Sequence, residues 1–183
     1  MVFNEKYEGK TSISGYYSAI SHSYDELHGK EQFEKLKVIG KHVRPEKDDL
    51  ILDVGCGTCF SRDFFNCNFK GVEPSKDMVL RHSKGKFLVG KDVFISGVEG
   101  LRGLFEENLF DYVICVTAAH HFMDVRRAFI DMRDLGKKGC VFGFSLLKGS
   151  GNYDECVSAI NDFFVVIDEE DVQRDKVFIC RKK

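Results

Sequence analysis

Residues 50–59, which read LILDVGCGTC, decide the fold of this chain. Apolar residues around Asp53 predict a short strand, and the glycines at 55 and 57 let the backbone turn sharply directly after it. The next residues, FSRDFF at 60–65, predict a helix. A strand, a glycine turn and a helix form the first unit of a doubly wound α/β sheet. The free N–H groups at the start of such a helix favour a ligand at the turn.

The alternation of strand and helix continues along the chain. The next apolar run ends at Glu73 and Pro74, and a helix with Ser75 as its N-cap follows it. Two apolar runs compete for the third strand, and both choices stay open. The further strands are expected at 69–72, at 87–90 or 93–96, at 110–116 and at 140–147, with helices at 75–83 and 124–135. The last of these strands is almost continuously apolar, which is typical of a strand covered on both faces.

The two ends of the chain differ from this pattern. Two apolar runs around the charged segment 169–175 predict a closing hairpin after a helix at 152–163. At the other end, two helices are expected at 16–27 and 31–43, separated by Gly29. The fold class is therefore a doubly wound, Rossmann-like, seven-stranded sheet, mostly parallel, with one antiparallel strand in the C-terminal hairpin.

Length and composition indicate one globular domain over residues 1–183. The chain is 43% hydrophobic and 31% charged, which excludes a disordered or collagen-like protein. Its net charge of −2 gives no overall basic field for nucleic acid or an anionic membrane. No apolar run approaches the roughly 18 residues of a membrane span. Seven scattered cysteines favour reduced thiols, so we expect a cytoplasmic protein without disulfides or membrane contact.

The nature of the ligand follows from a second acid. Glu73 ends the second strand about 20 residues after the turn, where an acid accepts hydrogen bonds from both ribose hydroxyls. Phe60 stands where a dinucleotide fingerprint needs its third glycine, which disfavours NAD. No Gly-Lys-Ser/Thr follows the turn, which excludes a P-loop. A nucleoside-containing ligand without a diphosphate fits these residues.

The segments ILDVGCGT, GVEPSKDM and FDYVICVTAAHHFMD, with KKG before the fifth strand, resemble the class I S-adenosylmethionine-dependent methyltransferases. The resemblance is to the small, type 11 members similar to ubiquinone and menaquinone methyltransferases, and it runs from about Asp49 to Leu147. It implies an enzyme of EC class 2.1.1 that uses S-adenosylmethionine. It further implies that residues 1–45 form a helical lid over a cofactor-binding core at 46–183.

The resemblance also implies roles for individual residues. Asp53 and the backbone of the glycine turn would hold the amino acid part of the cofactor, and Glu73 would hold the ribose. Pro74 and Met78 would pack near the adenine. The full set of cofactor-binding residues implied in this way is Tyr24, Asp53, Gly55, Cys56, Gly57, Glu73, Pro74, Met78, Gly97, Val98 and Val116.

Two positions depart from the family pattern. Gly97, beside Glu99, stands where the family has an acid for the adenine amino group; backbone atoms could substitute, or Asp92 if the earlier third strand is right. Cys59 replaces a usual glycine, which costs stability if the backbone there needs a positive φ. Cys56 and Cys59 also form a C-x-x-C, a pattern found in redox and zinc sites. No second pair completes a zinc site, so no metal is expected.

His120 and His121 follow the fourth strand, where the transferred methyl group is approached. At most one of these neighbours faces the pocket, as a catalytic residue that orients or deprotonates the acceptor; the other packs or caps the next helix. No Asn-Pro-Pro-Tyr motif is present, which favours a small-molecule oxygen, carbon or nitrogen acceptor. Two alternatives stay open: a noncatalytic binding or regulatory subunit, and an RNA-modifying enzyme that works with a small activator protein.

Overall fold

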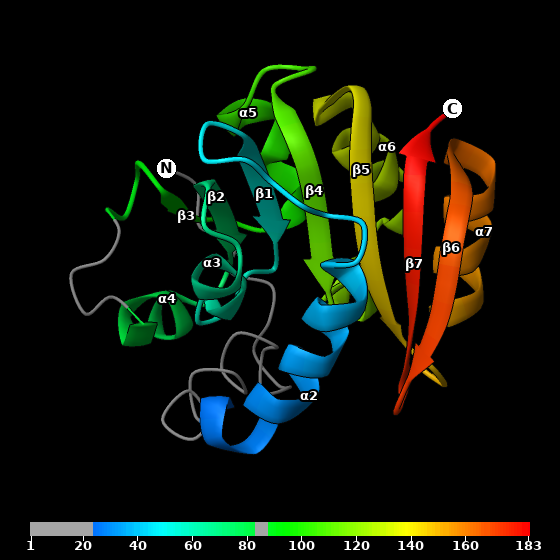
Figure 1. The fold of residues 1–183 in the computed structure, drawn as a ribbon, viewed down its shortest axis with the longest axis horizontal. Coiled ribbons are helices and arrows are strands. Elements are labelled where there is room, and N and C mark those ends of the chain that lie inside the picture. Colours follow the sequence, from blue (N-terminus) through cyan, green and yellow to red (C-terminus); the bar gives the residue numbers. More distant parts are fainter. Residues whose placement is uncertain (1–23, 83–87) are drawn as a thin grey trace.

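The computed structural model describes residues 24–82 and 88–183, which form one seven-stranded sheet with helices on both faces (Figure 1). The strand order is β3-β2-β1-β4-β5-β7-β6. Every neighbouring pair is parallel except those of β7, which runs antiparallel to both β5 and β6. The doubly wound fold class with one reversed strand is therefore confirmed. The strands are β1 Leu50–Val54, β2 Asn68–Glu73, β3 Val93–Ile95, β4 Phe110–Val116, β5 Gly136–Leu147, β6 Phe164–Val172 and β7 Asp175–Lys182.

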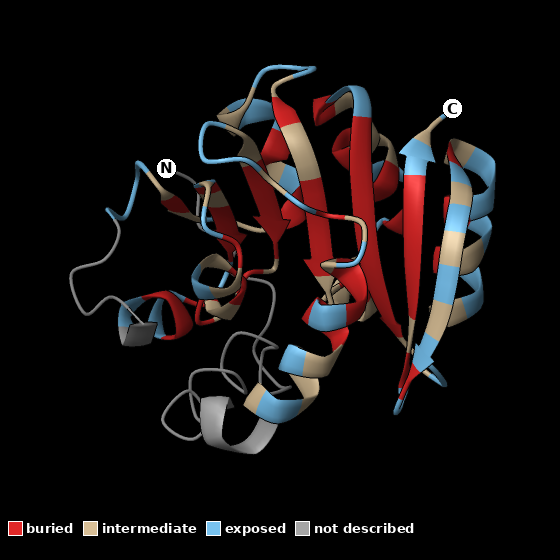
Figure 2. Cartoon of the chain, viewed as in Figure 1, coloured by how far each residue is buried: buried red, intermediate tan, exposed pale blue. Residues whose placement is uncertain are grey.

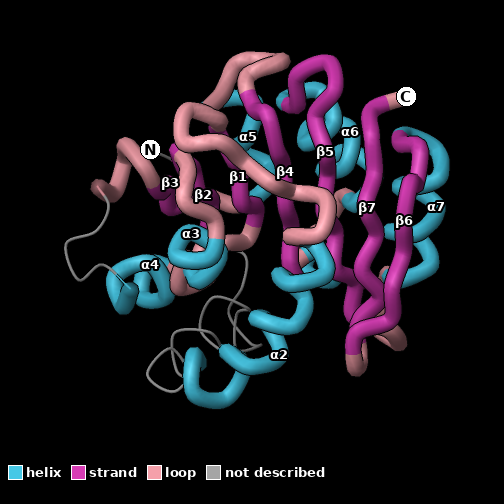
Figure 3. Tube along the Cα trace, viewed as in Figure 1, coloured by secondary structure: helices cyan, strands magenta, loops and turns pink. Residues whose placement is uncertain are grey.

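Six helices and two short 3₁₀ turns connect the strands in the described part of the chain (Figure 3). They are α2 Tyr24–Ile39, α3 Phe60–Phe64, α4 Lys76–His82, the 3₁₀ turn Val98–Gly100, α5 Leu101–Leu104, the 3₁₀ turn Ala119–His121, α6 Val125–Leu135 and α7 Tyr153–Phe163. The prediction of a helix break at Gly29 is wrong, because α2 continues through it. Burial of Leu36 and Ile39 against the sheet offsets the cost of one glycine, about 1 kcal/mol. The rest of the first expected helix, 16–23, lies outside the described residues.

Two strand boundaries needed the three-dimensional structure. Of the two candidates for the third strand, the later one forms β3, while Val89 makes only an isolated bridge to Val93. The hairpin strands are longer than expected, since β6 and β7 extend through the charged segment to a turn at Gln173 and Arg174. Exposed and partly buried residues alternate with one another along β6 (Figure 2), and its ladder with β7 continues through the charged residues after one register shift between Val166 and Asp168.

Two hydrophobic cores cover the two faces of the sheet. Helices α5, α6 and α7 pack on one face, where Phe142, Phe144 and Phe164 form a cluster of aromatic rings. Helix α2 and the short helices α3 and α4 cover the other face, on which Ile39 and Ile51 are fully buried. The central strands are therefore covered on both sides, as their apolar sequences indicated. None of the described helices could serve as a membrane span.

The strand order reverses between β1 and β4. From β1 the chain proceeds outward to β2 and β3, and it then returns to β4 on the other side of β1. In sheets of this type, ligands bind beyond the carboxyl ends of the strands at that reversal. The turn after β1 and the segment after β4 therefore face each other across the expected site.

The contact between α2 and the sheet depends on Gly143 of β5. A Cβ on Gly143 would lie 2.9 Å from Cγ2 of Ile39. We expect Gly143→Val to lower the free energy of unfolding by about 1–3 kcal/mol, because the added methyl groups displace α2. Urea unfolding monitored by circular dichroism measures this. Gly103→Ala in α5, where nothing lies within 4 Å, is the control and should stabilise by about 0.4–1 kcal/mol. Equal stability of Gly143→Val and the wild type would contradict the assignment.

Candidate functional site

The turn after β1 is clamped between its two neighbouring strands. The backbone N–H groups of Gly55 and Cys56 both donate to the Val72 carbonyl of β2, at 2.8 and 3.1 Å. Gly55 has φ 76°, and a Cβ there would overlap the Cβ of Ala118 in the segment after β4. Glycine is therefore required at 55 for two reasons, the backbone angle and the close approach of the β4 segment.

Cys59 adopts the left-handed conformation that the glycine of the family pattern would adopt without strain. Its φ is 61° and its side chain is fully buried directly before α3. The thiols of Cys56 and Cys59 lie 3.5 Å apart, and burial raises the pKa of Cys56 well above its ordinary value. A buried, protonated thiol is a poor nucleophile and a poor metal ligand. Among the described residues, no group of three or more His, Cys, Asp or Glu side chains could hold a metal ion.

Asp53 places a carboxylate at the end of β1, directly before the glycine turn. Its Oδ2 accepts a hydrogen bond from the Ser61 hydroxyl, whereas its buried Oδ1 has no partner among the described residues. Burial raises the pKa of Asp53 to about 7, against the lowering effect of the Ser61 hydrogen bond. A buried carboxylate oxygen without a partner is costly, and a cationic or hydrogen-bond-donating ligand group would offset this cost.

Glu73 at the end of β2 ties the glycine turn to the start of α4. Its Oε2 accepts from the N–H of Gly57 at 3.0 Å, and its Oε1 accepts from the N–H of Ser75 at 2.8 Å. Burial raises its pKa, while these two backbone hydrogen bonds lower it. Each carboxylate oxygen has two lone pairs, so Glu73 keeps acceptor capacity for ligand hydroxyls while it holds both loops.

A pocket opens beside the glycine turn. It is lined by Gln32, Leu36, Asp53, Gly55, Cys56, Gly57, Thr58, Phe60, Ser61 and Val116. Five of the residues expected at the cofactor are among them, namely Asp53, Gly55, Cys56, Gly57 and Val116. The sequence analysis missed Ser61 and the α2 residues. A signal was present for Gln32 and Leu36, which lie four residues apart and so share one helix face, whereas Ser61 reaches Asp53 only through the bend of the glycine turn.

The other expected cofactor residues are not among those that line this pocket. Met78 is buried in α4 with its Cε 3.3 Å from the position of a Cβ on Gly57, and Pro74 is exposed. Val98 is buried in the core. Tyr24 is the first residue of α2, and its side chain lies outside the described part of the chain.

Residue 97, where the family pattern has an acid after β3, is a glycine, but the side chain of Glu99 reaches this position. The Glu99 carboxylate folds back so that its Oε2 occupies the space in which a Cβ on Gly97 would stand. A carboxylate is thus present at this strand end although residue 97 has no side chain. Asp92, the alternative considered from the sequence, precedes β3 and accepts from the Leu88 N–H at 2.9 Å. It therefore lies at the amino end of the strand, away from the site.

His120 and His121 occupy the 3₁₀ turn after β4, with ring centroids 3.8 Å apart. Burial and the neighbouring His120 lower the pKa of His121 to about 4, and burial also lowers the pKa of His120. Both rings are therefore neutral near pH 7. The Nδ1 of His120 is buried and has no partner among the described residues. The Asn152 side chain donates to the Ala119 carbonyl at 3.1 Å and so fixes this turn.

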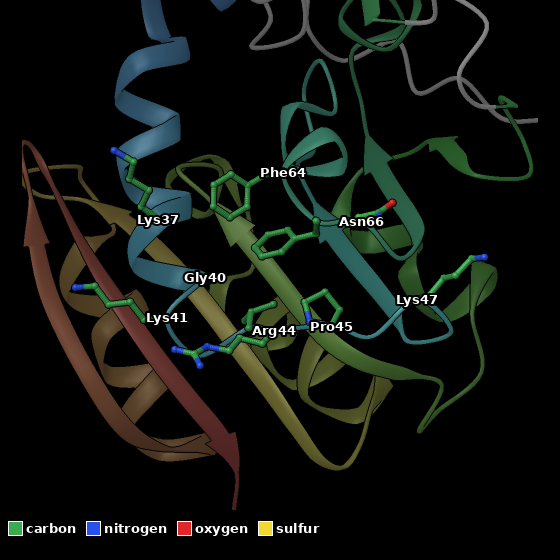
Figure 4. A pocket seen from close by; sticks show the side chains of 10 residues that line it. Lys37, Gly40, Lys41, Arg44, Pro45, Lys47, Phe64 and Asn66 are labelled. Atoms are coloured by element: carbon green, nitrogen blue, oxygen red, sulfur yellow. The ribbon is translucent and has the colours of Figure 1, made fainter.

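A second, larger pocket of about 690 Å³ lies at the opposite ends of the strands (Figure 4). It is lined by Lys37, Gly40, Lys41, Val43, Arg44, Pro45, Lys47, Phe64, Phe65 and Asn66. The basic side chains point in different directions, and two of them form ion pairs with Glu34 and Glu170. They do not converge on one point, so this pocket presents no single anion site.

The unusual ionisation of Asp53 gives a test of its burial. An acid whose folded pKa is raised loses folded-state stability as the pH rises from its ordinary value of 3.8 to about 7. We expect Asp53→Asn to be more stable than the wild type at pH 8 by up to about 4 kcal/mol, with little difference near pH 3. Urea unfolding between pH 3 and pH 8 measures this.

Asp111 provides the control, because its pKa is shifted downward whereas that of Asp53 is shifted upward. Burial raises the pKa of Asp111, but hydrogen bonds from Lys137 and the Leu50 N–H lower it more, so the net shift is downward. Asp111→Asn should therefore lose stability at pH 8 and approach the wild type as the pH falls below about 4. A gain for Asp53→Asn that is independent of pH would contradict the argument.

Comparisons with known proteins agree with this geometry. Residues 52–144 match a family described as a methyltransferase domain. The sterol 24-C-methyltransferase erg6 of Schizosaccharomyces pombe is 29% identical over 114 residues, which are 58% of this chain and 30% of that protein. The chain thus matches less than a third of the length of this relative.

Two solved structures show the same fold. The putative methyltransferase in complex with the Trm112 activator of Haloferax volcanii superposes with a TM-score of 0.74 at 13% identity, covering 91% of this chain and 97% of that one. The 1,6-didemethyltoxoflavin-N1-methyltransferase of Burkholderia thailandensis, with S-adenosylhomocysteine bound, gives 0.66 at 14% identity and covers 100% and 98%. The family match covers more than half of the sequence and contains the end of β1, the glycine turn and both acidic strand ends. The chain belongs to the methyltransferase-domain family of class I S-adenosylmethionine-dependent methyltransferases.

Proposed function

We propose that this protein transfers the methyl group of S-adenosylmethionine to a small molecule that carries a hydroxyl, amino or acidic carbon group. One observation carries the proposal: a buried carboxylate oxygen of Asp53 without a partner lines the pocket beside the glycine turn. The ammonium group of the cofactor's amino acid part is the kind of donor that this oxygen lacks. S-adenosylmethionine, when bound, supplies an already activated methyl group.

The residues of the chain need only bind, orient and exclude water. Asp53 would hold the ammonium group and the backbone of Gly55–Gly57 the carboxylate, while Glu73 would accept from the ribose hydroxyls. The Glu99 carboxylate beside Gly97 would take the place of the family's adenine-binding acid. Positioning of this kind contributes effective molarities of about 10⁵–10⁸ M, so no covalent residue is required.

His120 and His121 remain our candidates for contact with the acceptor. They follow β4, and Ala118, directly before their turn, touches Gly55 of the cofactor turn. Because both rings are neutral near pH 7, they act as hydrogen-bond partners that orient an acceptor, and only weakly as bases. Among the proteins compared above, the name of the sterol 24-C-methyltransferase specifies a carbon acceptor and that of the 1,6-didemethyltoxoflavin-N1-methyltransferase a nitrogen acceptor. The family therefore leaves the acceptor atom open.

Ion pairs on the surface favour a small acceptor over RNA. Arg126, Arg127 and Lys137 form ion pairs with Asp162, Asp131 and Asp111. These cations are neutralised on the surface and leave little field for a phosphate backbone. A partner protein stays a prediction, supported by the activator complex of the Haloferax volcanii structure. Cofactor binding without methyl transfer to any acceptor would instead favour the noncatalytic subunit.

A thermal shift series with S-adenosylmethionine, S-adenosylhomocysteine and NAD tests the cofactor site. A ligand at 100 times its Kd stabilises the fold by about 2.7 kcal/mol, which raises the melting midpoint measurably. We expect shifts with the first two ligands and none with NAD. Glu73→Ala should abolish the shifts, because it removes the ribose acceptor and frees the Gly57 and Ser75 N–H groups. Glu107→Ala, at an exposed acid, is the control. Shifts that persist in Glu73→Ala would refute this role.

The close approach at Gly55 gives an independent test. Gly55→Ala adds a methyl group that overlaps Ala118 and strains a positive φ, so the turn must move. We expect the Kd for S-adenosylhomocysteine, measured by calorimetry, to rise by more than about tenfold. Gly139→Ala matches the backbone strain, with φ 90°, but meets nothing within 4 Å and lies at the other end of the sheet. It should bind as the wild type does. Equal affinity in both variants would show that the turn does not contact the ligand.

A further inference from the structure

A buried polar cluster lies at the carboxyl edge of the sheet, on the β5 and β7 side of the pocket. We call Lys35, Thr117, Ser145 and Asp175 the Asp175 cluster. They come from α2, the residue after β4, β5 and the start of β7. Lys35, Ser145 and Asp175 are each 0% exposed. Segments far apart in the sequence therefore converge on one group of polar atoms.

The Asp175 carboxylate uses only one of its two oxygens. Its Oδ2 accepts from the Thr117 and Ser145 hydroxyls, at 2.7 and 2.5 Å, and lies 3.1 Å from Nζ of Lys35. Its Oδ1 is buried and has no hydrogen-bond partner among the described residues. A fully buried carboxylate whose partners all lie on one side is oriented to offer the other oxygen to a ligand.

Lys35 fixes that orientation. Its ammonium group has three donors, and they meet Glu31 Oε1 at 2.7 Å, Thr117 Oγ1 at 2.8 Å and Asp175 Oδ2 at 3.1 Å. Lys35 is therefore fully satisfied and cannot turn to the free oxygen. A buried ion pair is often no more stabilising than apolar residues of similar volume, so stability alone does not account for this one.

His120 carries another unpartnered atom at this edge of the sheet. Its Nδ1, with Asp53 Oδ1 and Asp175 Oδ1, is one of three buried side-chain atoms that have no hydrogen-bond partner among the described residues. His120 lies three residues after Thr117, whose hydroxyl donates to Asp175, and burial lowers the pKa of His120, with smaller opposing effects of Asp175 and Lys35. The side chains of His120 and Glu31 are partly exposed, whereas Lys35 and Asp175 are buried beneath them.

The cluster adjoins the cofactor turn through a strained backbone. Thr117 has φ 54°, a conformation that is unfavourable for a β-branched residue, and Ala118 after it touches Gly55. The hydroxyl of Thr117 at once accepts from Lys35 and donates to Asp175. The network that orients Asp175 thus begins one residue from the contact with the methyl-donor site. Strained residues that are held in this way are common at functional sites.

We propose that Asp175 Oδ1 and His120 Nδ1 bind the hydroxyl or N–H group of the methyl acceptor, with Lys35 as a positioning residue. This inference rests on the proposed function and narrows its acceptor class. One lysine faces two carboxylates, of Glu31 and Asp175, so the cluster together with its neighbour Glu31 carries a net negative charge. It selects a neutral or cationic donor group and rejects a carboxylate or phosphate at the reacting position.

Three probes of similar size distinguish these chemistries. The full-length protein, saturated with S-adenosylhomocysteine, is titrated with phenol, anisole and benzoate while the ring ¹⁵N resonances of histidine are recorded. We expect phenol to shift the Nδ1 resonance of His120 and to bind at least about tenfold more tightly than the other two. Anisole lacks the donor and benzoate has the wrong charge. Phenol that binds no better than anisole, including the absence of binding by both, overturns the proposal.

Asp175→Asn tests the residue without changing its shape. The amide oxygen can stay with Lys35 and the two hydroxyls, which places the amide nitrogen, a donor, where Oδ1 offered an acceptor. We expect the preference for phenol over anisole to fall by about tenfold, while the Kd for S-adenosylhomocysteine changes by less than about twofold. An undiminished preference would overturn the proposal.

A double variant separates binding from folding. Lys35→Met with Asp175→Leu replaces the buried pair by apolar side chains of similar size, and the one carboxylate that loses its lysine, Glu31, is partly exposed to solvent, so the variant should fold. We expect it to bind S-adenosylhomocysteine and to lose the preference for phenol. The control, Lys41→Met with Glu170→Leu, removes an exposed pair between the same two parts of the chain and should keep the preference. If the buried pair were only structural, both double variants would keep the preference for phenol over anisole. Failure of the wild type to bind S-adenosylhomocysteine would instead refute the proposed function.

Discussion

The contact between the glycine turn and the ends of the neighbouring strands is the constraint on which the rest of the site depends. The turn after β1 donates two N–H groups to the Val72 carbonyl of β2, and it touches Ala118 after β4 through the bare Cα of Gly55. Glu73 adds a third tie through the N–H of Gly57. These contacts close the crevice at the reversal of strand order and leave Asp53 beside it, buried and half-satisfied. With a side chain at residue 55, the segment after β4 would have to move away, and the histidines with it.

Local sequence was sufficient for most of the fold because each strand is a short apolar run that ends in a recognisable turn. It was not sufficient where contacts between residues far apart in the sequence determine the local structure or the pairing of charges. Gly29 looked like a helix end, yet packing of α2 on the sheet keeps it helical. Asp53, Gly55 and Glu73 were identifiable because chemistry and position coincide at adjacent strand ends. Lys35 and Asp175 were not, since they are 140 residues apart and look like surface charges until the sheet brings them together. The one signal was a lysine on the apolar face of a helix, beside Leu36.

The two buried aspartates have the same hydrogen-bonding pattern but different electrostatic surroundings. Asp53 and Asp175 each hold one oxygen in hydrogen bonds and leave the other without a partner among the described residues. Among the residues that the structure describes, no cation pairs with Asp53, and burial raises its pKa to about 7. Asp175 instead has Lys35 at 3.1 Å. Both violate the expectation that buried polar groups are satisfied, and such violations are expected where function requires them. A ligand that satisfied both oxygens would carry a donor at each end of the crevice.

The direction of β7 explains why an aspartate near the C-terminus reaches the site at all. In a parallel strand the residue at the carboxyl edge of the sheet is the last one, as Asp53, Glu73 and Val116 show to within one residue. β7 is antiparallel, so its first residue, Asp175, pairs with Leu147 at that same edge. The turn at Gln173 and Arg174 returns the chain to this edge of the sheet. The hairpin therefore does more than close the sheet, because reversing one strand brings the Asp175 carboxylate within hydrogen-bond distance of a serine of β5 and the lysine of α2 at the carboxyl edge.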